Sequence, residues 1–329
     1  MDHPDRFVEH SLRTSMFFPA TRLMVAGNPK AAGTTLRWWL LRAHGVDVDD
    51  RTRESWWGES APYQTVWDSH MALDFVWPQL TADDQRDALE SDDVLTVVPV
   101  RHPVTRSFSA WSGKWLIGEA YYEENLPAEF PPLPDSFSGA EEVADCFRHF
   151  MVALGQVVDD RGFEAVDVHL WPQSRLLARE VRGQRLEMRQ EDMSAGFAAV
   201  TEHLESHGVD PGSPPRINET VVPYLADLVD DEALATIVRL YGDDFSTYRY
   251  SQERPASSSR PLSVDWLNDV RGRNRRYGVI HRALMRESHE HHRLEREVEQ
   301  SRRREAELVD STSWKVTGPL RWVSDRNKR

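Results

Sequence analysis

Residues 29–35 bring together side chains that commonly bind anions: a lysine, a glycine and two threonines. The apolar run at 22–27 predicts a buried strand, and the helical spacing of apolar residues from 35 onward predicts a helix. A helix N-terminus presents backbone N–H groups and a partial positive charge to whatever lies in front of it. A glycine lets the backbone approach a phosphate, the threonines add hydroxyl donors and the lysine adds a full charge. We therefore expect an anion to bind at Lys30, Ala31, Ala32, Gly33, Thr34 and Thr35.

The order of residues in this loop separates it from the nucleotide loops of kinases and ATPases. A Walker A loop has Gly-Lys-Ser/Thr at the start of its helix. Here Lys30 precedes Gly33, so a kinase or ATPase is disfavoured. For this segment taken alone, an ordinary turn with an exposed lysine is the alternative.

A second basic segment follows the apolar run at 94–100. Arg101 comes directly after this run, and Ser109 follows eight residues later. The forked guanidinium of an arginine suits a dianionic phosphate, and a hydroxyl one or two helical turns away adds a donor. Arg106 and Lys114 are interpreted as solvated charges in preference to helpers in binding.

Both segments resemble motifs of the sulfotransferase superfamily. Residues 29–35 resemble its 5′-phosphosulfate loop, and residues 101–111 resemble its 3′-phosphate motif. Residues 69–75 resemble the histidine segment of uronyl 2-O-sulfotransferases, and residues 167–177 resemble a Pro-Gln segment of Golgi-type carbohydrate sulfotransferases. Residues 216–219 and 238–250 resemble the closing portion of that group. The missing Golgi anchor and the single cysteine suggest a bacterial relative.

The resemblance implies a fold, a donor and an acceptor. The fold would be α/β: a P-loop-like three-layer fold with a central parallel sheet flanked by helices. The donor would be 3′-phosphoadenosine 5′-phosphosulfate (PAPS), held at the loop residues and at Arg101 and Ser109, and the acceptor a glycan or glycolipid hydroxyl. A third strand is expected at 165–170.

Transfer of a sulfuryl group by in-line displacement needs a cation at the leaving phosphate and a base for the acceptor proton. Lys30 is the expected cation. His70 is the expected base, because a neutral imidazole accepts a proton near pH 7. His169, Glu54 and Glu59 stay open as alternatives.

Three residues near the Pro-Gln segment are candidates for the acceptor or adenine pocket: His169, Trp171 and Gln173. Core packing is an equally good interpretation of Trp171. No metal site is expected, because the histidine cluster at 289–292 lies in a charged segment and is interpreted as solvated.

The distribution of charge limits the partners. The net charge is −14, yet residues 271–329 carry 16 basic against 9 acidic side chains. The body is therefore strongly acidic, and general binding of nucleic acid is not expected. A single cysteine and the lack of a signal peptide or membrane-spanning run favour a cytoplasmic protein, with peripheral association at the inner membrane face as a possibility.

Composition divides the chain into a sulfotransferase domain at 1–250, a Ser/Pro-rich linker at 251–264 and a charged helical tail at 265–329. A weak coiled-coil seam in the tail would allow a homo-oligomer. Its Trp-rich basic end, residues 311–323, suits an anionic membrane surface or a glycan-assembly partner. A phosphotransferase and a non-catalytic glycan-assembly scaffold are the two competing functions.

Overall fold

The computed structural model describes residues 5–46, 75–117, 127–215 and 222–276. His70, Glu54, Glu59 and residues 277–329 of the expected tail lie outside the described residues. The chain divides into two compact units, Met1–Arg271 and Gly272–Arg329. In the described part, no helix combines the length and the apolar character needed to cross a bilayer.

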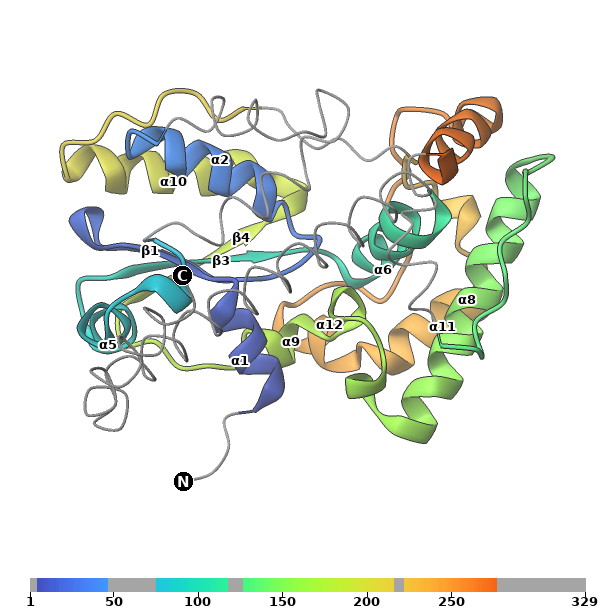
Figure 1. Cartoon of the computed structure of the whole chain (residues 1–329), viewed down its shortest axis with the longest axis horizontal. Coiled ribbons are helices and arrows are strands. Elements are labelled where there is room, and N and C mark those ends of the chain that lie inside the picture. Colours follow the sequence, from blue (N-terminus) through green and yellow to red (C-terminus); the bar gives the residue numbers. More distant parts are fainter. Residues whose placement is uncertain (1–4, 47–74, 118–126, 216–221, 277–329) are drawn as a thin grey trace, which may run out of the picture. The chain divides into compact units, whose positions relative to one another are not determined.

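The first unit is built on a four-stranded sheet in the order β1-β2-β3-β4 (Figure 1). Its strands are β1 (Met16–Phe18), β2 (Leu23–Val25), β3 (Leu95–Val100) and β4 (Gln184–Arg189). β2, β3 and β4 run parallel, whereas β1 is antiparallel to β2. The expected α/β fold is confirmed, although the sheet is mixed and not purely parallel. The carboxyl ends of β2, β3 and β4 therefore share one edge.

Helices cover both faces of this sheet (Figure 1). On one face lie α2 (Gly33–Ala43) and α10 (Met193–Ser206); on the other lie α1 (Arg6–Arg13) and α5 (Ala82–Glu90). Alternation along β2 explains the two layers, because Leu23 and Val25 join the α2 cluster while Met24 joins the α5 cluster. Strands buried on both faces read as continuous apolar runs, as the sequence shows for β2 and β3.

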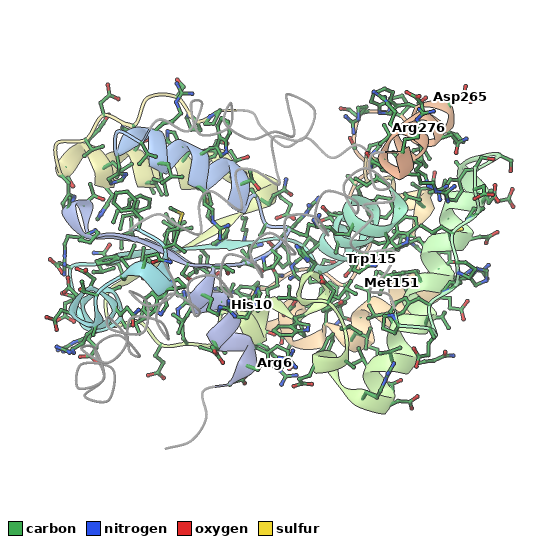
Figure 2. The ribbon with its side chains drawn as sticks, in the orientation of Figure 1. Arg6, His10, Trp115, Met151, Asp265 and Arg276 are labelled. Carbon is green, nitrogen blue, oxygen red and sulfur yellow. The ribbon has the colours of Figure 1, made fainter. Side chains whose placement is uncertain are left out.

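A third group of helices extends beyond the sheet. It contains α6 (Pro103–Trp111), α8 (Ala140–Arg161), α9 (Gln173–Leu176), α11 (Asp231–Leu240) and α12 (Gly242–Thr247). A π-helical turn, η4 (Ser112–Leu116), continues α6. Trp115 of η4 and Met151 of α8, both labelled in Figure 2, belong to the same buried cluster. Short 3₁₀ turns are η1 (Pro19–Thr21), η3 (Trp77–Gln79), η5 (Phe163–Ala165), η6 (Val168–Leu170), η7 (Gln190–Asp192) and η8 (Ala226–Leu228).

The strand expected at 165–170 is wrong, because the chain forms the turns η5 and η6 there. The cause is local: the Asp167 carboxylate accepts a hydrogen bond from the backbone N–H of His169 at 2.9 Å. An aspartate that binds the backbone two residues ahead diverts the chain into a turn. The strand that pairs with β3 is β4 instead.

The expected linker and the start of the expected tail pack within the first unit. The Ser258 N–H donates to the Tyr224 carbonyl at 2.8 Å. A helix at 264–276 follows; Leu267 is buried in the large cluster, and the Asn268 side-chain amide exchanges two hydrogen bonds with the Phe137 backbone. Residues 265–271 are therefore part of the first compact unit.

The loop at residues 28–32, which carries Lys30 and joins β2 to α2, is called the basic loop below. Gly27 lies between β2 and this loop and lets α1 pack against the end of the strand. A Cβ at this position would lie 2.0 Å from the Thr14 hydroxyl oxygen. Two serines of this segment bind the glycine backbone: Ser11 Oγ donates to its carbonyl and Ser15 Oγ accepts from its N–H. A close backbone approach of this kind excludes any side chain.

Candidate active site

The basic loop joins β2 to α2 at the carboxyl edge of the sheet, as the sequence predicts. Two of its residues have left-handed backbones, Lys30 with φ 65° and Ala32 with φ 59°. L-residues adopt this region at a cost, and such strain concentrates at functional sites. The Leu36 N–H donates to the Ala32 carbonyl at 3.2 Å, so α2 begins directly after the loop. The loop thus lies immediately in front of a helix N-terminus, where anions are favoured.

Arg101, at the end of β3, contacts this loop. Its Nη1 donates to the Lys30 carbonyl at 3.3 Å, and its Nε donates to the Thr105 hydroxyl at 3.1 Å. Ser109 is four residues beyond Thr105 in α6, so the two hydroxyls lie on the same helix face. Burial lowers the pKa of the Arg101 guanidinium to about 10, which leaves it charged at neutral pH. The two basic segments found in the sequence are therefore adjacent in space.

The Gln173 side chain forms hydrogen bonds both with the end of β3 and with Asn28 at the start of the loop. It is fully buried; its Oε1 accepts from the Arg101 N–H at 3.0 Å and its Nε2 donates to the Arg101 carbonyl at 2.7 Å. The same Oε1 accepts from Asn28 Nδ2 at 3.2 Å, and that amide also donates to the Pro99 carbonyl. The Gln173 side chain thus positions Arg101, while its expected role in lining a pocket stays a prediction.

Arg106 is 2% exposed, so its interpretation as a solvated charge is wrong. Its Nε donates to the Pro29 carbonyl at 3.2 Å and its Nη1 to the Trp171 carbonyl at 2.8 Å. Burial lowers the pKa of Arg106, and the nearby buried carboxylate of Asp244 opposes this shift. Arg106 therefore holds the basic loop and the 167–171 segment in fixed relation.

His169 and Asp167 form a hydrogen-bonded pair on that segment, with 2.6 Å between Nδ1 and Oδ1. Burial lowers the pKa of His169 to about 4 against the opposing effect of Asp167, and the positive charges of Lys114 and Lys30 lower it further. The ring is therefore neutral at pH 7. A carboxylate only accepts hydrogen bonds, so Nδ1 carries the hydrogen and Nε2 carries the lone pair.

The remaining acceptor-pocket candidate is Trp171, which lies in the core. Trp171 is 4% exposed, its Nε1 donates to the Val166 carbonyl, and its ring packs edge-on against Phe7 at 4.6 Å. Of its two interpretations, these contacts agree with core packing. Among the described residues, no group of three or more His, Cys, Asp and Glu side chains could hold a metal ion.

Several residues at this edge were not found from the sequence. Thr105 had a usable signal, since it lies four residues from both Arg101 and Ser109. Asp167 also had a local signal, because an aspartate two residues before His169 can bind its backbone in a turn. Asn28 had none, because its partners come from distant segments.

A comparison with protein families agrees with this geometry. The family model described as "Sulfotransferase family" matches residues 14–251, which include the loop, Arg101, Ser109 and Gln173. No curated protein and no solved structure matches the chain significantly. Membership supports sulfuryl transfer as the general reaction. Since the matched region spans well over half of the sequence, the chain belongs to the sulfotransferase family.

Proposed function

We propose that the protein transfers the sulfuryl group of PAPS to a hydroxyl of a glycan or glycolipid. The contact between Arg101 Nη1 and the Lys30 carbonyl is the observation that carries this proposal. It brings the two basic motifs to one sheet edge, where a nucleotide with phosphate groups at both its 5′ and 3′ positions would engage both. Because the body of the chain is strongly acidic, such an anion depends on these local donors.

The proposed reaction forms one bond and breaks another at sulfur. The acceptor oxygen attacks sulfur while the bond to the bridging oxygen of the 5′-phosphate breaks, and the products are a sulfate ester and 3′-phosphoadenosine 5′-phosphate. Lys30 neutralises the charge that develops on the departing phosphate, and the start of α2 binds that phosphate. Arg101 and Ser109 bind the 3′-phosphate.

The acceptor proton requires a base. His70 stays our first prediction and lies outside the described residues. His169 is the second candidate, supported by the Asp167 contact that orients its ring and by the Arg106 bridge that ties its segment to the loop. A glutamate at position 54 or 59 is the third.

A second part of the proposal concerns location. The tail would bring the enzyme to an inner membrane surface or to a glycan-assembly partner through its basic, Trp-rich end. Truncation after residue 276 should then preserve turnover on a small soluble acceptor and reduce sedimentation with anionic vesicles. Unchanged sedimentation would contradict this tethering role.

The direct test is transfer itself. Purified protein is incubated with PAPS and a panel of oligosaccharide acceptors, and sulfated products are detected by mass spectrometry alongside release of 3′-phosphoadenosine 5′-phosphate. We expect a sulfated glycan from wild type and a strongly reduced yield from Lys30→Ala under the same conditions. Phosphorylated products with ATP, and no product with PAPS, would favour the phosphotransferase instead.

A further inference from the structure

Gly113 lies in the π-helical turn η4, and the end of the Lys30 side chain occupies the space beside it. A Cβ built at Gly113 would lie 2.8 Å from Lys30 Nζ and 3.9 Å from Lys30 Cε; among the described residues outside its own turn, no other heavy atom lies within 4 Å of it. A separation under 3 Å is too short for a real Cβ contact. Any side chain at this position would therefore displace the ammonium.

The backbone of Gly113 does not itself require glycine. Its φ is not positive, in contrast to Gly45, Gly162 and Gly208. An alanine would be sterically accommodated by the turn, apart from the Lys30 contact. The lack of a side chain at 113 is therefore explained by Lys30 and not by the turn.

Both sides of this contact are anchored. Trp115 and Leu116 of η4 are 3% and 0% exposed, so the turn cannot withdraw from the lysine without disturbing the core. On the other side, the Lys30 carbonyl accepts from Arg101, and Arg106 holds the neighbouring Pro29 carbonyl. Both backbones are therefore anchored, and the flexible end of the Lys30 side chain is the part that would move away from a Cβ at position 113.

We propose that Gly113 is a positioning residue, which sets the place of the Lys30 ammonium for charge neutralisation at the leaving phosphate. This proposal rests on the proposed function. Electrostatic catalysis depends on preorganised geometry, so a displaced ammonium loses most of its effect in the transition state while the donor can still bind. The contribution of η4 to the reaction is thus the space that Gly113 leaves for the Lys30 ammonium.

The decisive variant is Gly113→Ala, with Gly242→Ala as its matched control. Gly242 opens α12, and a Cβ there would meet nothing within 4 Å. We expect Gly113→Ala to lower kcat by about 10- to 100-fold, the scale of a displacement of about 1 Å in an active site. Affinity for 3′-phosphoadenosine 5′-phosphate should change by less than the fall in kcat. The melting temperature should not fall, because alanine is the better helix former. Gly242→Ala should leave kcat unchanged.

A double-mutant cycle separates positioning from a structural role. In a Lys30→Ala background, Gly113→Ala should have no further effect on kcat beyond about twofold, since the group that it displaces is gone. An equal loss in both backgrounds, a wild-type kcat for Gly113→Ala, or a lowered melting temperature that persists without Lys30 would each overturn the proposal.

The same cycle distinguishes this inference from the proposed function. If Lys30→Ala strongly lowers kcat while Gly113→Ala is active at the wild-type rate, only the positioning role fails. If Lys30→Ala turns over PAPS normally, the transfer reaction stands, but Lys30 is not the catalytic cation and the positioning role of Gly113 fails with it. A wild-type enzyme that gives no sulfated product would contradict the proposed function itself.

Discussion

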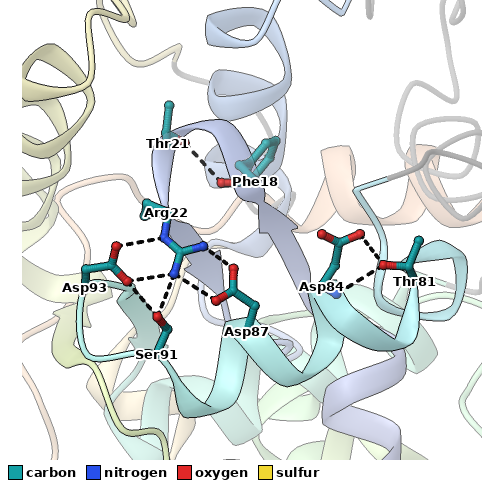
Figure 3. Close-up of polar contacts among 8 residues, drawn as sticks. All are labelled: Phe18, Thr21, Arg22, Thr81, Asp84, Asp87, Ser91 and Asp93. Atoms are coloured by element: carbon teal, nitrogen blue, oxygen red, sulfur yellow. Dashed lines mark hydrogen bonds and ion pairs between the residues drawn. The ribbon is translucent and has the colours of Figure 1, made fainter.

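The two ends of the parallel strands differ in the charged groups that surround their basic side chains. At the amino end, Arg22 precedes β2, and carboxylates surround its guanidinium (Figure 3). It pairs with Asp87, and its Nη2 donates to Asp93 Oδ1 at 2.7 Å and to Ser91 Oγ at 2.7 Å. The hydrogen bonds to Asp87 and Asp93 raise the pKa of Arg22, and Arg22 in turn lowers the pKa of Asp93 to about 2.

At the carboxyl end, positive charges lie near one another. Burial is the main cause that lowers the pKa of Arg101; the nearby carboxylate of Glu191 opposes this shift, and the charge of Arg106 adds to it. Lys114 and Lys30 likewise lower the pKa of His169. Gathering like charges in a partly buried site opposes stability unless an anion neutralises them.

The comparison indicates a division of labour within one sheet. The amino end matches its cation with acids and so contributes to folding. The carboxyl end gathers Lys30, Arg101 and Arg106, and the nearby Glu191 and Asp244 offset their charge only in part. Although the chain as a whole has a net charge of −14, this local positive charge favours an anionic ligand at that edge. Charge removal should therefore change catalysis and ligand binding at one end, and stability at the other.

The largest effect is expected at Lys30. Lys30→Ala should lower kcat about 100- to 1,000-fold, the range for a lost electrostatic contact in the transition state. Steady-state assays with PAPS measure this, and circular dichroism checks that the fold is intact. Arg22→Ala is the control from the other end of the sheet and should retain the wild-type kcat. A near-normal kcat in Lys30→Ala would contradict the proposal that charges at the carboxyl end serve catalysis.

The next effect concerns the base and depends on pH. If His169 is the base, protonation of its ring stops the reaction, so kcat/KM for the donor should fall only as pH decreases toward about 4. His169→Ala should lower kcat roughly 100-fold and remove that limb. A wild-type limb near the ordinary histidine value of about 6.5 that disappears in His70→Ala would assign the base to His70.

Arg101 should control affinity more than rate. Arg101→Ala should weaken binding of 3′-phosphoadenosine 5′-phosphate by about 2–3 kcal/mol, the scale of a lost charge-assisted hydrogen bond. Calorimetry should show a much smaller loss for adenosine 5′-phosphosulfate, which lacks the 3′-phosphate. Equal losses for both ligands would mean that Arg101 binds another group.

The smallest effect is expected at the amino end. The folded pKa values of Asp87 and Asp93 are lowered, chiefly by hydrogen bonds from Arg22. Their contribution to stability is therefore complete above the unfolded value of about 4 and is lost as pH falls toward 2. Thermal unfolding of wild type and Arg22→Ala should differ at pH 7 and converge as pH is lowered through this window. A difference that stays constant with pH would exclude this origin.

Local sequence signals predicted the elements that carry the two basic motifs. β2 and β3 are short apolar runs, and Gly33 and Pro103 begin the helices after them, so hydrophobic pattern and breakers were sufficient. β4 escaped prediction because it is polar and half-exposed, and its place depends on pairing with β3. Strand pairing between distant segments leaves little trace in local sequence.

The site could be predicted only as far as side-chain chemistry reveals it. The type and spacing of Lys30, Arg101 and Ser109 indicated anion binding without any structure. The burial of Arg106 could not be predicted, because it depends on two carbonyls from separate segments that meet at its guanidinium. The backbone contacts of Gln173 arise in the same way, from tertiary packing.

Thermal stabilisation by nucleotide is the most direct test of the central claim, that the carboxyl edge binds a nucleotide with phosphates at both its 5′ and 3′ positions. Wild type and Arg101→Ala are melted with 3′-phosphoadenosine 5′-phosphate or with ATP at equal concentrations. A ligand that binds only the folded state raises the free energy of unfolding, by about 2.7 kcal/mol at a ligand concentration of 100 times Kd. The melting temperature rises accordingly. We predict a clear rise for wild type with 3′-phosphoadenosine 5′-phosphate, a reduced rise for Arg101→Ala and none with ATP. An equal or larger rise with ATP would contradict the account.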